Sequence, residues 1–281
     1  MKHAIDTKMK GLVLELSDEP GPDFLTTRGL QKGLVAYNDG DCLVQEGLGF
    51  GAPILGTQTE TYFSKTARLQ ATEECLVKTF KFDCASQIEM GAKGLESPAL
   101  RYGFEALVGL YMRVERLQPV ILKLQRGLAR SFNASCRFID VEPVGQARVT
   151  YWPVEAGMRI VSEFETAIKN PQFIMVNEQG ADFFDRAELD GRELAGDGIT
   201  GWMSAGKATL RSSATGLRFS IDGCPSSRLF AGRERTPYLS WAGLDLHSRK
   251  RRLEYELVIG EDGRRPGRRL GKADDGVVAD G

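Results

Sequence analysis

Short runs of alternating apolar and polar residues recur along most of this 281-residue chain, and they constrain its fold more than any other feature. A period of two places successive side chains on opposite faces of a β-strand. Gly, Pro, Asn and Asp separate the runs, and these residue types favour turns. The pattern therefore predicts a mainly β protein whose strands pair as antiparallel hairpins.

The runs are short and close together, as is typical of a large β-sandwich. Asn38, Asp39 and Gly40 predict one tight hairpin turn, because these residue types tolerate positive φ angles. The expected strands span residues 11–17, 33–38, 41–46, 65–71, 75–82, 137–142, 146–154, 158–168, 173–176, 207–213, 217–221, 228–231, 238–246 and 252–259.

Gly47, Gly49 and Gly51 alternate with other residues just after one of these strands. Closely spaced glycines can hold a phosphate, because backbone N–H groups then approach the anion closely. Here Pro53 follows, no helical period comes after it, and no Lys-Ser or Lys-Thr pair is present. A bulged or sharply bent strand accounts for the glycines better.

One long stretch, residues 97–133, shows helical periodicity instead. Ser97 and Pro98 suit an N-terminal cap and the first helical position. Pro119 lacks the N–H that would continue the helix, so it predicts a kink or a break. A kinked helix or helix pair is therefore expected at about 97–133, with Leu124 on its buried apolar stripe. The opposite face would carry a basic strip made of Lys123, Arg126 and Arg130.

Composition excludes several classes of protein. The formal net charge is −1, so no overall positive field would attract nucleic acid or an anionic membrane. The five cysteines are an odd number and widely scattered, which argues against a disulfide framework or structural zinc. No segment approaches the roughly 20 apolar residues of a membrane-spanning helix, and residues 1–10 contain no signal-peptide core. The expectation is a cytoplasmic protein with reduced thiols, no metal and no cofactor.

The chain is expected to form one β-sandwich domain over residues 1–260, with the helical stretch as an insertion. From Glu261 onward, arginines are interleaved with Gly and Pro, and no apolar face is available for burial. Residues 261–281 are therefore predicted to form a disordered tail. The tail gives no strong nucleic-acid signal, because acidic residues lie beside its basic ones and no aromatic residue is present to stack on bases.

The strongest candidate for chemistry is the polar segment that follows the apolar run 173–176. It begins with Asn177 and Glu178 and continues to Asp182, so an expected buried strand would deliver carboxylates to a sheet end. A carboxyl group beside an apolar wall has a raised pKa, which suits a general acid or base near neutral pH. Glu178 and Asp182 are therefore candidate catalytic residues. The alternative is a solvated loop with local ion pairs to Arg186.

A second candidate lies at Arg233, Glu234 and Arg235. Planar guanidinium groups suit carboxylate, phosphate or vicinal hydroxyl groups, so the two arginines are candidate substrate clamps and Glu234 the catalytic partner of Glu178. The alternative is surface ion pairing, with the nearby aromatic residues in the core. His247 is expected to be an ordinary surface histidine. Aromatic side chains that could bind a sugar ring are Tyr238, Trp241 and Trp202.

These features together predict a large antiparallel β-sandwich. The number and length of its strands resemble, at the level of architecture, the supersandwich of sugar mutarotases and of glycosidase accessory domains. The pair of active-site histidines usual in that family has no counterpart here, so no residue role follows from the resemblance.

Two functions remain open, and with them the question of whether the protein is an enzyme. The first is a carbohydrate-active or carbohydrate-binding protein, epimerase- or mutarotase-like or hydrolytic, whose ligand is a sugar or a sugar phosphate. The second is a non-catalytic scaffold that binds a partner protein through a sheet face or through the basic helix strip.

Overall fold

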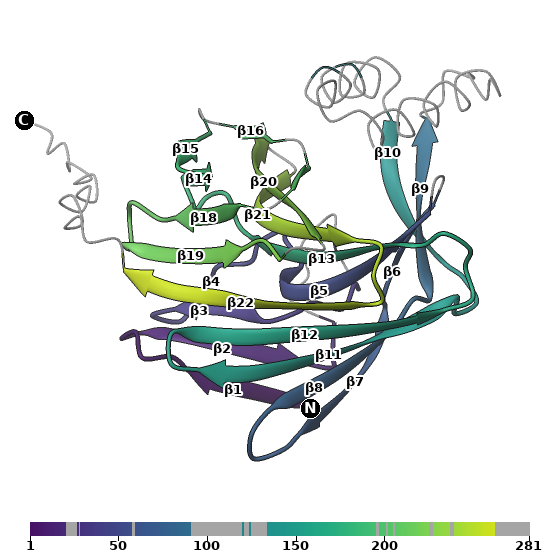
Figure 1. Ribbon diagram of the computed structural model, residues 1–281, viewed down its shortest axis with the longest axis horizontal. Helices are drawn as coiled ribbons and strands as arrows, with labels where there is room; N and C mark the ends of the chain where they lie inside the picture. Colours follow the sequence, from purple (N-terminus) through teal and green to yellow (C-terminus); the bar gives the residue numbers. More distant parts are fainter. Residues whose placement is uncertain are drawn as a thin grey trace, which may run out of the picture.

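A computed structural model describes residues 1–20, 27, 29–57, 60–90, 120, 124, 134–194, 197–200, 202–204, 206–224, 227–236 and 239–261. Nearly all regular structure in these ranges is β, and the strands form three antiparallel sheets (Figure 1). The prediction of a mainly β, antiparallel protein is confirmed.

Sheet 1 is the smallest and contains the N-terminal strands in sequential order. Its last two strands are joined at Asp39 and Gly40, whose φ angles are 49° and 90°, so the predicted hairpin turn is confirmed. The strands are β1 (Lys2–Asp6), β2 (Leu12–Ser17), β3 (Val35–Asn38) and β4 (Asp41–Cys42).

Sheet 2 has nine strands, in the order β10-β9-β6-β5-β13-β21-β20-β16, with β17 also paired to β20. The hairpin of β9 and β10 extends beyond the rest of the sheet (Figure 1). The strands are β5 (Gly49–Gly56), β6 (Thr61–Phe63), β9 (Cys84–Met90), β10 (Ala134–Asp140), β13 (Gln172–Gln179), β16 (Gly198–Ile199), β17 (Met203–Ser204), β20 (Ser227–Thr236) and β21 (Leu239–Ser248).

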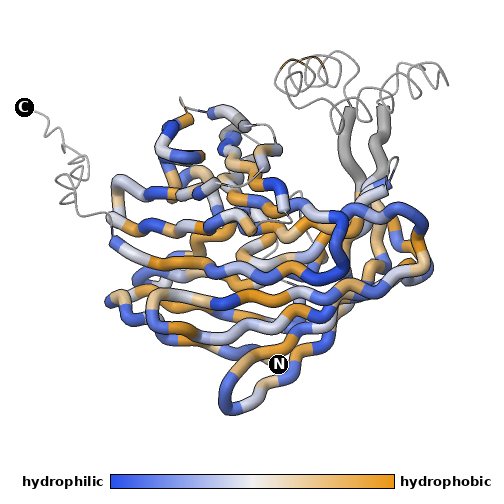
Figure 2. The backbone as a smooth tube through the Cα atoms, in the orientation of Figure 1, coloured by the Kyte–Doolittle hydropathy of each residue, from blue (hydrophilic) through white to orange (hydrophobic). Residues whose placement is uncertain are grey.

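Sheet 3 also has nine strands, in the order β15-β14-β18-β19-β22-β12-β11-β8-β7. Its long strands show the expected alternation of apolar and polar residues (Figure 2). The strands are β7 (Thr66–Ala71), β8 (Leu76–Lys81), β11 (Gly145–Val154), β12 (Gly157–Thr166), β14 (Arg186–Leu189), β15 (Arg192–Glu193), β18 (Lys207–Arg211), β19 (Leu217–Asp222) and β22 (Arg252–Glu261).

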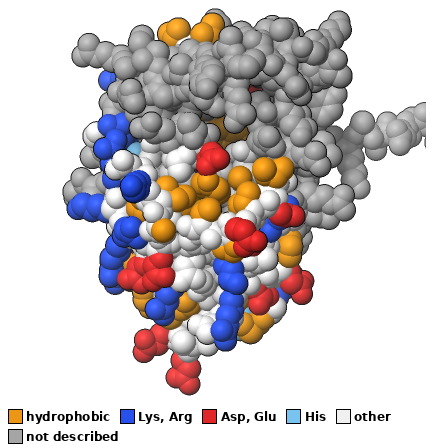
Figure 3. All heavy atoms as spheres, turned by 90° about the vertical axis from the view of Figure 1, so that its right-hand side faces the viewer, with side chains coloured by type: hydrophobic (Ala, Val, Ile, Leu, Met, Phe, Trp, Pro, Cys, Tyr) orange, Lys and Arg blue, Asp and Glu red, His pale blue; other side chains and the backbone are white. Residues whose placement is uncertain are grey.

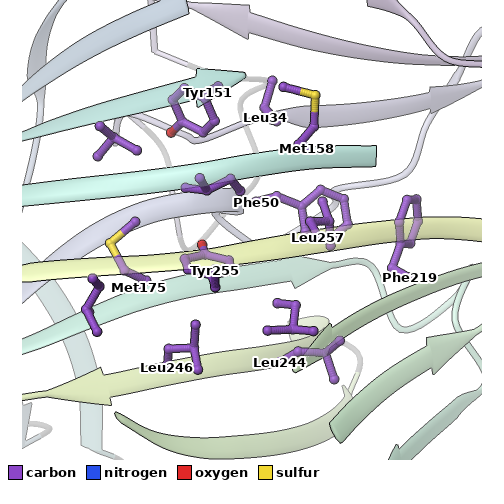
Figure 4. Close-up of a cluster of buried hydrophobic side chains, with 14 of the residues drawn as sticks. Leu34, Phe50, Tyr151, Met158, Met175, Phe219, Leu244, Leu246, Tyr255 and Leu257 are labelled. Carbon is purple, nitrogen blue, oxygen red and sulfur yellow. The ribbon is translucent and has the colours of Figure 1, made fainter. Parts of the chain in front are cut away.

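The main core is shared by all three sheets. Leu14 from sheet 1, Met175 from sheet 2 and Ile160 from sheet 3 belong to one cluster of buried apolar side chains. Figure 4 shows side chains of sheets 2 and 3 pointing toward one another in this cluster. Val176, the neighbour of Met175, belongs to a second, smaller cluster. Because successive residues of a strand point to opposite faces, this second cluster lies on the outer face of sheet 2.

A β-bulge interrupts β5 at the glycines singled out in the sequence. Phe50 pairs with Asn177 and Ala52 with Val176, so Gly51 between them has no partner on β13. Gly49 and Gly51 have φ angles of 76° and 75°, which residues other than glycine adopt only with strain. The interpretation of these glycines as a bulged strand is confirmed.

The predicted kinked helix at 97–133 is not confirmed. Apart from Val120 and Leu124, this stretch lies outside the described residues, as do Pro119 and the basic strip of Lys123, Arg126 and Arg130. Both described positions are helical, and their side chains are 66% and 51% exposed. The prediction that Leu124 is buried is therefore wrong, because a helical period defines a face without saying what the face contacts. The predicted tail also lies outside the described part from residue 262 onward.

The surface at one end of the molecule combines apolar and charged side chains. Figure 3 shows apolar side chains gathered near its centre, with Lys, Arg, Asp and Glu side chains around them. No helix in the described part of the chain is long and apolar enough to cross a membrane.

Candidate functional site

Glu178 lies within a strand of sheet 2, although the sequence placed it after the strand's end. Strand β13 continues to Gln179, and Asn177 and Gln179 are fully buried on its inner side. Glu178 therefore points to the outer face, where it remains partly exposed. The strand was predicted too short because Asn177 and Gln179 are polar residues facing a core.

Several groups surround the Glu178 side chain. The Leu48 N–H donates a hydrogen bond to Glu178 Oε2 at 3.3 Å. The buried Lys32 ammonium group adds positive charge, and its Nζ donates to the Gly47 carbonyl oxygen at 2.6 Å. Burial nevertheless raises the pKa of Glu178 from 4.5 to about 7, and the Leu48 N–H and Lys32 offset only part of that effect.

Asp245 on β21 interacts electrostatically with Glu178, and it was not predicted from the sequence. Its side chain is 8% exposed, and its Oδ1 accepts a hydrogen bond of 3.0 Å from the Asn177 N–H. The pKa of Asp245 is raised well above its usual range by burial and then by the charge of Glu178. Glu178 pairs directly with Gly243, two residues before Asp245, so both carboxyl groups lie on the same face.

This pair can both donate and accept a proton near neutral pH. When two carboxyl groups interact strongly, ionisation of one disfavours ionisation of the other. Lys32 and the Leu48 N–H favour the ionised form of Glu178, whereas the charge of Glu178 disfavours that of Asp245. Asp245 is therefore suited to keep a proton while Glu178 loses its own, which provides an acid beside a base.

Asn177 fixes the strands beneath the pair. Its Oδ1 accepts hydrogen bonds from the Gly51 N–H at 3.0 Å and from the Tyr255 hydroxyl at 2.8 Å. Its Nδ2 donates to the Leu244 carbonyl oxygen at 3.1 Å. These bonds join the bulge in β5, strand β21 and strand β22 of sheet 3. The backbone that carries Glu178 and Asp245 is thus held by a satisfied buried polar network.

An aromatic ladder lies beside the carboxyl pair. The rings of Trp241 and Phe230 stack with centroids 6.2 Å apart, and those of Trp202 and Phe230 lie 5.2 Å apart. Phe230 pairs across the strands with Asp245, which places the ladder next to the carboxyl groups. Trp202 and Phe230 are buried, whereas Trp241 is partly exposed. Trp241 is therefore the member with ring surface available to a ligand.

His247 lies on the same face of β21, next to Trp202. The prediction that it is an ordinary surface histidine is wrong. Its side chain is 8% exposed, and its ring lies 5.4 Å from that of Trp202. Burial, together with the positive charges of Arg228 and Arg249, lowers the pKa of His247 to about 4. The ring is therefore neutral at pH 7, with Nε2 3.2 Å from Gln172 Oε1.

Glu234 lies on the same face of sheet 2 as Glu178, but it is further from Glu178 than Asp245 is. Glu234 is partly exposed and pairs across the strands with Trp241. From the pairing of β13, β21 and β20, the Cα atoms of Glu178 and Glu234 lie about 12 Å apart. Asp245, on the adjacent strand, is closer and interacts electrostatically with Glu178.

Asp182 and Arg233 take part in contacts that hold loops. Asp182 is exposed, and its Oδ2 accepts a hydrogen bond of 2.6 Å from Gln45 Nε2. Arg233 Nε and Nη2 donate to the Phe184 and Ala181 carbonyl oxygens at 2.9 and 3.1 Å, and Nη1 bonds Asp197. Three donors of this guanidinium group are thus used within the protein.

The remaining predicted binding residues are described in part or not at all. The backbone of Arg235 belongs to β20, but its side chain lies outside the described part, and so does Tyr238. The described residues contain no group of three or more His, Cys, Asp or Glu side chains that could hold a metal ion.

One sequence signal could have identified Asp245. On β21, Ala242, Leu244 and Leu246 are fully buried in the main core. The alternate positions are Trp241, Gly243, Asp245 and His247. A strand whose second face carries aromatic, glycine and titratable residues is typical of a site built on a sheet.

Comparison with known proteins identifies no family. No protein-family model matches the chain, and no curated protein sequence matches it significantly. Among solved structures, the chain is similar to a galactose mutarotase-like protein from Lactobacillus casei ATCC 334. The sequence identity is 9% and the TM-score 0.43, and the match covers 92% of this chain and 100% of that chain. No residue role is transferred from that protein.

Proposed function

We propose that the protein is carbohydrate-active and that Glu178 and Asp245 exchange protons with a sugar bound against Trp241. The observation that supports the proposal best is the interacting carboxyl pair beside a partly exposed tryptophan. An aromatic face provides an apolar surface for the C–H face of a sugar ring, while carboxyl groups bind its hydroxyls. Both kinds of group lie on one face of sheet 2.

In the epimerase-like form of the proposal, the ionised Glu178 accepts the proton of the anomeric hydroxyl. Asp245 donates its proton to the ring oxygen, and the bond between that oxygen and the anomeric carbon breaks. Rotation of the resulting open-chain aldehyde, followed by the reverse proton transfers, gives the other anomer and restores both carboxyl groups. The two protons balance, and no cofactor takes part in this step.

In the hydrolytic form, the same pair acts on an acetal. Asp245 protonates the leaving oxygen, and Glu178 activates water or attacks the anomeric carbon. Around this centre, we propose that Glu234 and Asp182 bind sugar hydroxyls at the border of the site, and Arg235 and Tyr238 stay candidate substrate-binding residues. Arg233 acts through the loops it holds, and Trp202 supports the aromatic ladder.

The test begins with binding. Thermal shift and calorimetry against a panel of neutral sugars and sugar phosphates should reveal a ligand whose affinity falls in Trp241→Ala. Anomer exchange, followed by polarimetry, should then be faster with the protein than without it. Glu178→Gln should reduce that rate by about 10²–10⁴-fold. Glu256→Gln, at an exposed position of β22, is the matched control and should leave the rate unchanged.

Two results would contradict the proposal. The first is a folded protein that binds no member of the panel and accelerates neither anomer exchange nor hydrolysis of glycosides. The second is a sugar affinity or reaction rate that Glu178→Gln, Asp245→Asn and Trp241→Ala all leave unchanged.

A further inference from the structure

Glycines surround Glu178 on the outer face of sheet 2. Across four adjacent strands, β20, β21, β13 and β5, one row of paired residues reads Gly232, Gly243, Glu178 and Gly49. Glu178 is therefore the one side chain in that row. Glycine within a strand weakens it, because glycine loses more conformational entropy on folding and adds no side chain to the packing. A specific structural role is therefore expected for the glycines next to Glu178.

Gly243 lies directly beside the Glu178 side chain. A Cβ atom added at Gly243 would be 2.8 Å from Glu178 Cγ, 3.4 Å from Asp245 Oδ1 and 3.5 Å from Trp241 Cε3. The first distance is shorter than a carbon–carbon contact allows. Because Gly243 has no side chain, the Glu178 side chain can occupy the space beside its Cα on β21.

Gly47 approaches Glu178 through the segment that precedes β5. A Cβ atom at Gly47 would be 2.9 Å from both the Cβ and the carbonyl carbon of Glu178. The next residue, Leu48, donates its N–H to the Glu178 carboxylate, and Lys32 holds the Gly47 carbonyl oxygen. This close approach brings the Leu48 N–H within reach of the carboxylate.

Space, and not backbone conformation, explains these two glycines. Neither Gly243 nor Gly47 is among the residues with positive φ angles, in contrast to Gly49 and Gly51. A residue with a side chain could adopt the same backbone at both positions without torsional strain. An added methyl group would instead clash with Glu178, with its side-chain Cγ at position 243 and with its Cβ and backbone carbonyl group at position 47.

We propose that Gly243 and Gly47 are positioning residues, whose missing side chains let Glu178 lie against β21 beside Asp245 and under the Leu48 N–H. The catalytic meaning of this arrangement rests on the proposed function, but the arrangement itself does not. With a methyl group at position 243, Glu178 turns toward solvent and the two carboxyl groups separate. Each of them then ionises more easily.

The test is a ¹³C NMR titration of the Glu178 and Asp245 carboxyl groups in the ligand-free full-length protein. Gly243→Ala should lower the titration midpoint of Glu178 by about one pH unit or more, because the carboxylate becomes better hydrated. Gly47→Ala should raise it instead, because the added methyl group moves the Leu48 N–H, which favours the ionised form, away from the carboxylate. Matched controls are Gly198→Ala, where no heavy atom of the described residues beyond its chain neighbours lies within 4 Å of an added Cβ, and Gly56→Ala, where the nearest such atom lies at 3.6 Å.

A folded Gly243→Ala variant with an unchanged Glu178 midpoint overturns the proposal. If Gly243→Ala folds poorly, a double-mutant cycle decides the matter. Glu178→Ala removes Cγ, the atom in closest contact, so adding Gly243→Ala to it should lower the melting temperature much less than adding it to the wild type. An equal loss in both backgrounds would show that Glu178 is not what Gly243 accommodates.

Anomer exchange, measured on the same variants, separates this inference from the proposed function. A shifted Glu178 midpoint without any sugar binding or turnover supports the positioning role and contradicts the carbohydrate proposal. Turnover by the wild type, retained in Gly243→Ala with an unshifted midpoint, supports the carbohydrate proposal and overturns the positioning role.

Discussion

Replacing Glu178 by glutamine should stabilise the protein at neutral and alkaline pH and have no such effect in acid. The folded protein raises the pKa of Glu178 from 4.5 to about 7, so between these values the folded state binds the proton more tightly than the unfolded chain does. Folding stability from this group is therefore complete below pH 4.5 and is lost as the pH rises through 7.

The size of the effect follows from the pKa shift. A rise from 4.5 to about 7 is 2.5 units, and each unit corresponds to about 1.4 kcal/mol, so ionised Glu178 costs the fold up to about 3 kcal/mol above pH 7. Glutamine resembles the protonated side chain in shape, and its NH₂ group can donate to Asp245. Glu178→Gln should recover most of this free energy, which amounts to roughly 5 °C in melting temperature for a chain of this length.

The assay is equilibrium urea unfolding of both proteins at pH 4.5, 6 and 8, with Glu256→Gln as the exposed control. The stability difference should be near zero at pH 4.5, intermediate at pH 6 and largest at pH 8, whereas the control should be flat. A difference independent of pH would refute the reasoning. A loss of stability at pH 8 would refute it too, because it would mean that ionised Glu178 stabilises the fold.

Three further predictions concern other residues. Burial lowers the pKa of Lys78 from 10.5 to about 7, so the free energy of unfolding of the wild type should increase as the pH is raised from 7 to 10.5. Lys78→Met should abolish this increase, which urea unfolding at a series of pH values would measure. Gln179→Leu should stabilise the fold by about 1–3 kcal/mol, because neither amide atom of Gln179 has a hydrogen-bond partner in the described structure. A lower melting temperature of the variant would instead indicate that a bound water is the partner of the amide group. Leu124→Ala should change the free energy of unfolding by less than about 1 kcal/mol, because the side chain is 51% exposed; a larger loss would indicate burial.

Much of the strand pattern could be predicted from sequence because its signals are local. Residues 146–154 and 158–168 were expected as strands, and the structure has β11 at Gly145–Val154 and β12 at Gly157–Thr166. Alternation and turn residues suffice for such boundaries. The end of β13 could not be predicted in this way, because Asn177 is buried on account of partners elsewhere in the chain, such as the Tyr255 hydroxyl 78 positions away.

Of the carboxyl pair in the candidate site, only Glu178 was predicted from the sequence. Glu178 stands out because a carboxylate follows an apolar run, which is a local signal. Its relation to Asp245 depends on the pairing of β13 with β21, and the hydrogen bond from the Asn177 N–H to Asp245 spans 68 positions. Glu234 was proposed as the partner because arginines flank it, but proximity along the chain does not determine which carboxyl group lies next to Glu178 across a sheet.

The most direct test of the account is a pH titration of the Glu178 and Asp245 carboxyl groups in the wild-type protein, followed by ¹³C NMR. Glu178 should titrate near pH 7, the midpoint of Asp245 should lie well above the usual range of an aspartate, and Glu178→Gln should lower the Asp245 midpoint, because it removes the negative charge beside Asp245. Midpoints near pH 4 for both groups, each unaffected by replacement of the other, would contradict the claim that these carboxyl groups form an acid–base pair.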